Sequence, residues 1–143
     1  MILLDANILL HAYDADAAHH GAARKWLEKA VSGPESVGIP WLVLWAFVRI
    51  STNLRVNVAP LPVSDAFQIV RSLLAHPNVN VIEPGARHAE ILERLSTTYQ
   101  VSGPMLTDAL LAALALEHGA TFVSTDRGFA RFTELRWVNP LAA

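Results

Sequence analysis

Met1-Ile2-Leu3-Leu4-Asp5-Ala6-Asn7 opens the chain with a continuous apolar run that ends at an acid. Such a run predicts a strand buried on both faces, as in a parallel sheet. Further short strands are predicted at 37–39, 79–82, 121–124 and 136–138. Helices are expected at 19–31, 40–53, 65–75, 85–99 and 105–118, with a brief coil at 7–13, a loop at 56–62 and a helical turn at 129–132. Because strands separated by helices need crossover connections, we predict a three-layer α/β/α sandwich with a mostly parallel central sheet.

The composition restricts the class of protein. The chain has 143 residues with a net charge of −2, and we expect one domain over 1–143. Cysteine is absent, which excludes disulfides and cysteine-ligated zinc. The apolar run 41–48, as long as any in the chain, is far shorter than the roughly 20 residues of a membrane-spanning helix. No basic leader precedes the first apolar run, so we expect a cytoplasmic protein without a signal peptide or membrane contact.

Three aspartates stand where such folds form ligand crevices, beyond the carboxyl ends of the strands or close to them. Asp5 directly follows a predicted strand and Asp126 follows another after one residue, although turn or helix capping is an alternative for each. Asp108 lies near the start of a helix rich in leucine and alanine, where helix-dipole stabilisation is the alternative. If the three carboxylates converge, their repulsion calls for a hard cation such as magnesium or manganese. Such an ion can activate water against a phosphodiester.

Three segments in this order resemble the PIN-domain ribonucleases: Ile2-Leu3-Leu4-Asp5-Ala6-Asn7, Thr107-Asp108 and Ser124-Thr125-Asp126-Arg127-Gly128-Phe129. The resemblance is strongest to VapC-type toxins of bacterial toxin–antitoxin pairs and covers essentially the whole chain. It implies a Mg²⁺-dependent endoribonuclease, with Mn²⁺ as the alternative ion, that hydrolyses RNA phosphodiester bonds; transfer RNA is one expected substrate class. It also implies a homodimer and a cognate VapB-type antitoxin that covers the active site.

The family pattern assigns the candidate site residues. The catalytic and metal-binding acids would be Asp5, Asp108 and Asp126. Asn7 would match the polar neighbour of the first acid, and Ser124 or Thr125 the hydroxyl before the last acid. Arg49 would match a basic position that is common in the family. Arg127 would either bind the RNA backbone or lie on a solvated surface. Arg49 would either lie near the substrate phosphate or complement the dipole at the C-terminus of its helix.

One departure from the family pattern lies at Ala46, where many members carry a glutamate, and no acid occurs from 37 to 63. We interpret this as a branch that builds its site with three aspartates. The alternative is a catalytically impaired relative that serves as an RNA- or protein-binding module. Phosphatases with an aspartate nucleophile and phosphoacceptor receivers need a lysine at a strand end, whereas Lys25 and Lys29 both lie in the first long helix.

Two further features have structural interpretations. Trp41 and Trp45, four residues apart on one predicted helix, fit the core or a dimer interface better than a base-stacking platform. His11, His19 and His20 are interpreted as surface or helix-start residues, because adjacent histidines point to different sides of a helix.

Overall fold

A parallel β-sheet forms the centre of the computed structural model, which describes residues 1–142; Ala143, the last residue of the expected domain, lies outside them. Within the described residues the sheet has five strands in the order β3-β2-β1-β4-β5, and every neighbouring pair is parallel. The strands are β1 (Ile2–Leu4), β2 (Val37–Pro40), β3 (Val79–Ile82), β4 (Thr121–Val123) and β5 (Trp137–Val138). The predicted sheet is therefore confirmed, and it is parallel throughout rather than mostly parallel.

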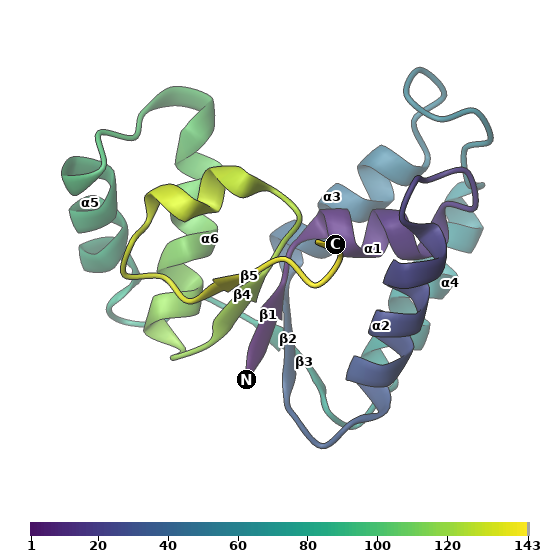
Figure 1. The fold of residues 1–143 in the computed structure, drawn as a ribbon, viewed down its shortest axis with the longest axis horizontal. Coiled ribbons are helices and arrows are strands. Elements are labelled where there is room, and N and C mark those ends of the chain that lie inside the picture. The colour runs from purple at the N-terminus through teal and green to yellow at the C-terminus, as the bar shows by residue number, and fades with distance from the viewer. Residues whose placement is uncertain (143) are drawn as a thin grey trace.

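The helices form two layers, one on each side of this sheet (Figure 1). One layer consists of α1 (Ala6–Tyr13), α2 (His20–Ser32), α3 (Trp41–Ser51) and α4 (Val63–Leu74). The other contains α5 (His88–Thr98) and α6 (Leu106–Glu117), together with the short 3-10 helices η1 (Gly103–Met105) and η2 (Arg127–Arg131). The three-layer architecture follows from the crossover helices, which must lie over a face of the sheet to connect parallel strands.

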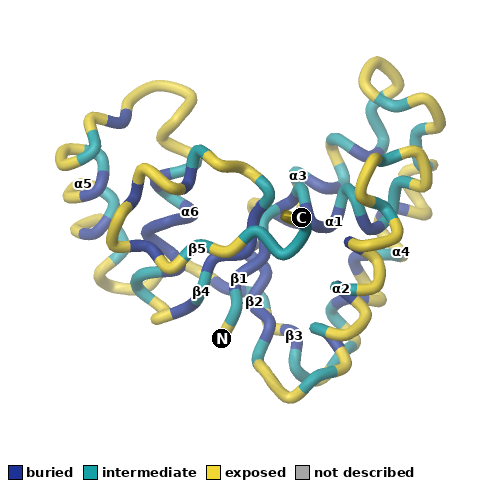
Figure 2. Tube along the Cα trace, viewed as in Figure 1, coloured by how far each residue is buried: buried dark blue, intermediate teal, exposed yellow. Residues whose placement is uncertain are grey.

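The core lies between the sheet and these helices (Figure 2). Helix α6 shows why the sequence folds this way, because its leucine- and alanine-rich middle, from Leu111 to Ala115, is buried throughout. Small alanines let this helix pack closely on the strands, and burial of its apolar surface stabilises the layer. Within residues 1–142, none of the helices is both long and apolar enough to cross a bilayer.

The first helix differs from the expectation. The coil expected at 7–13 is a regular eight-residue helix, α1, which begins at Ala6. Asp5 makes this possible as the N-cap residue, since its Oδ1 accepts a hydrogen bond from the Ala6 backbone N–H at 2.7 Å. A capping carboxylate replaces the partner that the first helical N–H groups lack.

Candidate active site

The candidate site lies at the carboxyl ends of β1 and β4, which are adjacent strands in the sheet. After β1 the chain enters α1 on one face of the sheet, and after β4 it enters η2 on the other face (Figure 1). In parallel α/β sheets, a crevice forms where neighbouring connections depart to opposite faces. Asp5, Ser124 and Asp126 all follow these two strands, so the topology brings them to one crevice.

A hydrogen-bond network joins the ends of the two strands. Asp5 Oδ2 accepts from the Ser124 hydroxyl at 2.7 Å and from the Asn7 amide at 3.2 Å. Asn7 also donates to Ser124 Oγ at 3.0 Å, and its Oδ1 accepts from the Thr125 backbone N–H at 3.0 Å. The Asp126 backbone N–H donates to Ser124 Oγ at 3.0 Å. These contacts fix both loops relative to the first acid.

The buried hydroxyl in this network is Ser124, whose side chain is fully buried. The sequence did not decide whether Ser124 or Thr125 supplies the hydroxyl before the last acid. Thr125 joins the network through its backbone N–H. Asn7 and Ser124 therefore both position Asp5, and Ser124 links Asp5 to the backbone of Asp126.

Asp126 is an exposed N-cap residue. Its Oδ1 accepts from the Gly128 backbone N–H at 2.8 Å at the start of η2. The capping alternative is thus confirmed for Asp126, as it is for Asp5. Capping does not remove either carboxylate from the site, because each carboxylate oxygen has acceptor capacity for more than one partner.

Asp108 approaches the same crevice from α6, in the first turn of that helix. It is half-buried, and its carboxylate accepts no side-chain or backbone hydrogen bond from residues 1–142. Burial raises the pKa of Asp108, and the charges of Asp126 and Asp5 raise it further, while Arg131 acts in the opposite direction. Asp126 and Asp5 are therefore the acids whose charges act on Asp108 and disfavour its ionised form.

Burial also dominates the electrostatics of Asp5. It raises the pKa of Asp5 above 3.8, and the charge of Asp126 adds to this effect. Hydrogen bonds from Ser124, Ala6 and Asn7 favour the ionised form and lower the pKa. Hydrogen-bond donors hold the Asp5 carboxylate in place, while the charge of Asp126 repels it. A cation bound beside this carboxylate would therefore be favourable.

The donor set is consistent with a hard divalent ion. Among residues 1–142, no group of three or more His, Cys, Asp or Glu side chains is arranged so that it could hold a metal ion. Magnesium, however, usually keeps several waters and is held by one or two carboxylates, so it needs no such group. Both oxygens of Asp108 and Oδ2 of Asp126 accept no hydrogen bond from the described chain. Oxygen donors of this kind suit magnesium or manganese.

Arg127, Arg49 and Ala46 are not part of the hydrogen-bond network around Asp5. Arg127, the first residue of η2, is exposed and lines a pocket together with Thr125. Arg49 is exposed on α3 and forms no ion pair with an acid of residues 1–142, so the structure does not join it to the three aspartates. Ala46 is half-buried and packs against the core from α3.

Arg131 and His11 have neighbours near the site that the sequence pattern did not specify. Arg131 influences Asp108 and donates to the Gly128 carbonyl at 3.2 Å. His11 and His19 line the same pocket as Arg127, although His19 and His20 do stand at the start of α2 as expected. The available signal was helical spacing, because His11 follows Asn7 by four residues and therefore lies on the same side of α1.

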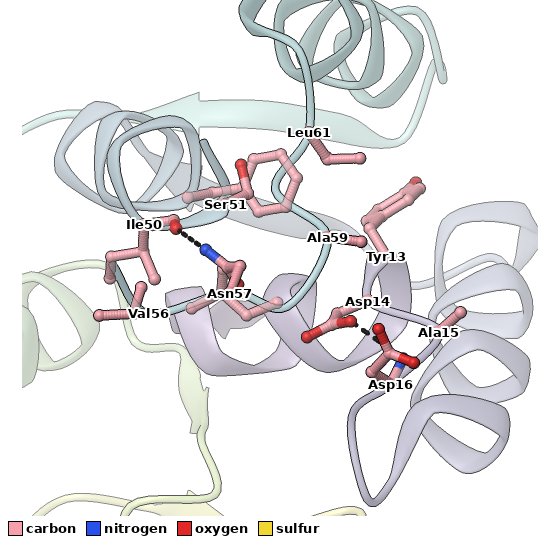
Figure 3. A pocket seen from close by; sticks show the side chains of 12 residues that line it. Tyr13, Asp14, Ala15, Asp16, Ile50, Ser51, Val56, Asn57, Ala59 and Leu61 are labelled. Atoms are coloured by element: carbon pink, nitrogen blue, oxygen red, sulfur yellow. Dashed lines mark hydrogen bonds between the residues drawn. The ribbon is translucent and has the colours of Figure 1, made fainter. Parts of the chain in front are cut away.

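A separate apolar pocket of about 330 Å³ lies between the end of α1 and the loop that follows α3 (Figure 3). Tyr13, Ile50 and Leu61 contribute apolar surface, and Asp14 and Asp16 stand at one end. Asp5, Asp108 and Asp126 do not line it. This pocket is therefore distinct from the acidic crevice.

The fold and the candidate site define an α/β protein with acidic side chains near the carboxyl edge of a parallel sheet. The chain belongs to the PIN domain family, whose model matches residues 2–135. It is 42% identical over 142 residues to Ribonuclease VapC37 of Mycobacterium tuberculosis, covering 99% of each protein. It is 43% identical over 141 residues to VapC ribonuclease Mb2897 of Mycobacterium bovis, covering 99% of this chain and 96% of that protein.

Solved structures show the same fold. VapBC2 from Rickettsia felis, bound to a DNA fragment from its promoter, superposes with a TM-score of 0.71 at 21% identity, covering 97% of this chain and 98% of that one. VapC20 of Mycobacterium tuberculosis, a toxin that cleaves the Sarcin-Ricin loop, gives a TM-score of 0.66 at 21% identity, with coverage of 91% and 93%.

Proposed function

We propose that this protein is a divalent-metal-dependent endoribonuclease, the toxin of a type II toxin–antitoxin pair, and that residues 1–143 act as one domain. The observation that carries the proposal is the 42% identity to a named VapC ribonuclease over nearly its full length, and the effect of the Asp126 and Asp5 charges on Asp108 supports a shared site. Such an enzyme acts in the cytoplasm, where its RNA substrates are. Nothing in the network resembles a nucleophile–base pair for covalent catalysis, and hydrolysis by water needs none.

In this proposal, Asp5 and Asp108 hold the metal ion, with Mg²⁺ as the first choice and Mn²⁺ as the second. Asp126 completes the site directly or through water. The bound ion supplies Lewis-acid chemistry, polarising the phosphodiester and lowering the pKa of water. Asn7 and Ser124 act as positioning residues, because their hydrogen bonds at 3.2 and 2.7 Å fix the orientation of the Asp5 carboxylate.

Charge balance explains why the residues suit this reaction. Without a cation, burial and mutual repulsion raise the pKa of Asp5 and Asp108, so the ionised site is electrostatically unfavourable. A divalent cation reverses that balance and leaves room for the negative phosphodiester. RNA with an exposed single-stranded loop, such as transfer RNA, is the proposed substrate class, because unpaired nucleotides are accessible to side chains.

We further propose that the chain forms a homodimer and binds a VapB-type antitoxin. Trp41 and Trp45 on α3 are stacked with ring centroids 5.4 Å apart, yet they are 38% and 46% exposed. Phe67 on α4, also exposed, lies 6.0 Å from the Trp45 ring. An exposed aromatic cluster is typical of a protein interface, which supports the interface interpretation over the core one.

The test is cleavage of cellular RNA by purified, antitoxin-free protein in magnesium, in manganese and in chelator. We expect cuts at defined sites with metal and none in chelator. Asp108→Asn should abolish cleavage while remaining folded, since this carboxylate accepts no hydrogen bond from residues 1–142. Asp65→Asn, at an exposed acid in the first turn of α4, is the matched control and should cleave normally. Cleavage that survives in Asp108→Asn would refute the assignment.

A further inference from the structure

A polar pocket of about 480 Å³ lies beside the acidic crevice. His11 and His19 line it from the α1 side, Thr125 and Arg127 from the segment after β4, and Asn139 from the C-terminal segment. Figure 1 shows the end of the chain returning past the sheet to lie next to α1. The three aspartates are not among the described residues that line this pocket.

The pocket is connected to the acidic crevice through α1. Asn7 and His11 are four residues apart on that helix, so His11 lies about one turn, or 5.4 Å, further along the same side. Asn7 Oδ1 accepts from the Thr125 backbone N–H at 3.0 Å, and Thr125 itself lines the pocket. A strand of RNA whose scissile phosphate lies at Asp5 therefore has the pocket as its neighbour.

Arg127 and Asn139 offer free donor groups to the pocket, and one ring nitrogen of His11 has no partner in the described part of the chain. Arg127 makes no side-chain hydrogen bond or ion pair within residues 1–142. Asn139 Oδ1 accepts from the Leu141 backbone N–H at 3.0 Å, which leaves its amide N–H groups for a ligand. The Nδ1 atom of His11 is buried and has no partner among the described residues. Donor groups without acceptors match an anion, and the arginine fork matches a phosphate in particular.

The charges around the two imidazoles favour the same ligand. The His11 and His19 rings meet edge to face with centroids 5.5 Å apart. Burial lowers the pKa of His11, the nearby His19 lowers it further, and Asp14 acts in the opposite direction. Arg127 across the pocket adds positive charge. An anion placed beside these groups would offset the positive charge of Arg127 and favour the protonated form of His11.

We propose that this pocket binds the phosphodiester adjacent to the scissile one, with Arg127, His11 and His19 as its phosphate-binding residues. The inference rests on the proposed ribonuclease function, because it assigns the ligand to the RNA strand. It adds a second contact on the substrate backbone that orients the strand across the acidic crevice. Phosphate contacts of this kind fix the register of a nucleic acid without reading its sequence.

The first test uses inorganic phosphate and the full chain in chelator, followed by the imidazole NMR signals of all histidines. We expect saturable shifts of the His11 and His19 signals, with His76 beyond the end of α4 unaffected. Arg127→Gln should weaken phosphate binding about tenfold or more, because it removes a charge-assisted contact. Arg71→Gln, an exposed arginine on α4, is the matched control and should bind normally. Shifts that do not saturate, or that persist in Arg127→Gln, would mean an adventitious ion only and overturn the proposal.

The second test separates this inference from the nuclease itself. Anisotropy of a labelled single-stranded RNA on the Asp108→Asn chain should show about tenfold weaker binding when Arg127→Gln is added. The slope of log K against log salt should fall by about 0.7. If wild type cleaves RNA while Arg127→Gln changes neither quantity, the ribonuclease stands and the pocket assignment fails. If phosphate binds saturably but no RNA is cleaved under any metal, the ribonuclease proposal fails and the anion site stands without its RNA ligand.

Discussion

Replacing Ser124 by alanine should destabilise the metal-free protein by about 3 kcal/mol. The Ser124 hydroxyl donates to Asp5 Oδ2 at 2.7 Å and accepts from the Asn7 amide and from the Asp126 backbone N–H, each at 3.0 Å. The two neutral contacts contribute about 1 kcal/mol each and the contact with a carboxylate about 2 kcal/mol. Asn7 keeps its bond to Asp5 in the variant, which brings the expected loss below the simple sum.

The assay is urea unfolding in chelator, monitored by circular dichroism, with a thermal melt beside it. For a chain of this size, about 3 kcal/mol corresponds to a fall of roughly 6–12 °C in Tm. Ser102→Ala is the matched control, because this serine is exposed and makes no capping hydrogen bond, so it should stay within about 0.5 kcal/mol of wild type.

A double-mutant cycle with Asn7→Ala completes the test. Because Asn7 and Ser124 share a hydrogen bond and both donate to Asp5, their effects should not add, with a coupling of about 1 kcal/mol. A loss below about 1 kcal/mol in Ser124→Ala, or strict additivity with Asn7→Ala, would refute the network as a structural unit.

Three further outcomes are expected. Because the pKa values of Asp5 and Asp108 are raised above 3.8, their ionised forms destabilise the metal-free fold at neutral pH. This destabilisation is lost as the pH falls through the raised pKa values toward 3.8. Unfolding in chelator should therefore show Asp108→Asn gaining less stability on acidification than wild type; an equal gain contradicts the electrostatics. Ala46→Glu should raise the cleavage rate at limiting magnesium, and unchanged or lower activity in a folded variant would show that α3 does not offer this position to the metal. Asp5→Ala should be about 1 kcal/mol less stable than Asp5→Ser, which keeps a capping oxygen for α1, and equal unfolding midpoints would contradict the capping assignment.

The strand ends of the candidate site were predictable because they depend on local patterns. An apolar run that stops at Asp5, or one that ends at Val123 before Ser124, Thr125 and Asp126, marks where a buried strand leaves the sheet. Asp108 stood out because a carboxylate interrupts a helix of leucine and alanine. Parallel topology then carries these positions to one edge.

Side-chain orientation was not predictable in the same way. Ser124 and Thr125 are neighbouring hydroxyls at a strand end, and only the three-dimensional course of the loop shows that Ser124 turns toward Asp5. The pocket at His11 also depends on the C-terminal segment, which comes back to α1 across more than 100 positions of sequence. Arg49 forms no ion pair with an acid of residues 1–142, and this depends on the rotation of α3, which helical spacing alone does not fix.

The capping bond of Asp5 has a consequence for how this site would decay during evolution. A lineage that lost catalysis would still be selected to keep an oxygen at position 5, since α1 begins on it. Asp108 accepts no hydrogen bond from residues 1–142, so replacing it would remove no hydrogen bond from the fold of these residues. Among relatives of this chain that have lost catalysis, we therefore expect the aspartate at position 108 to be replaced earlier than the aspartate at position 5.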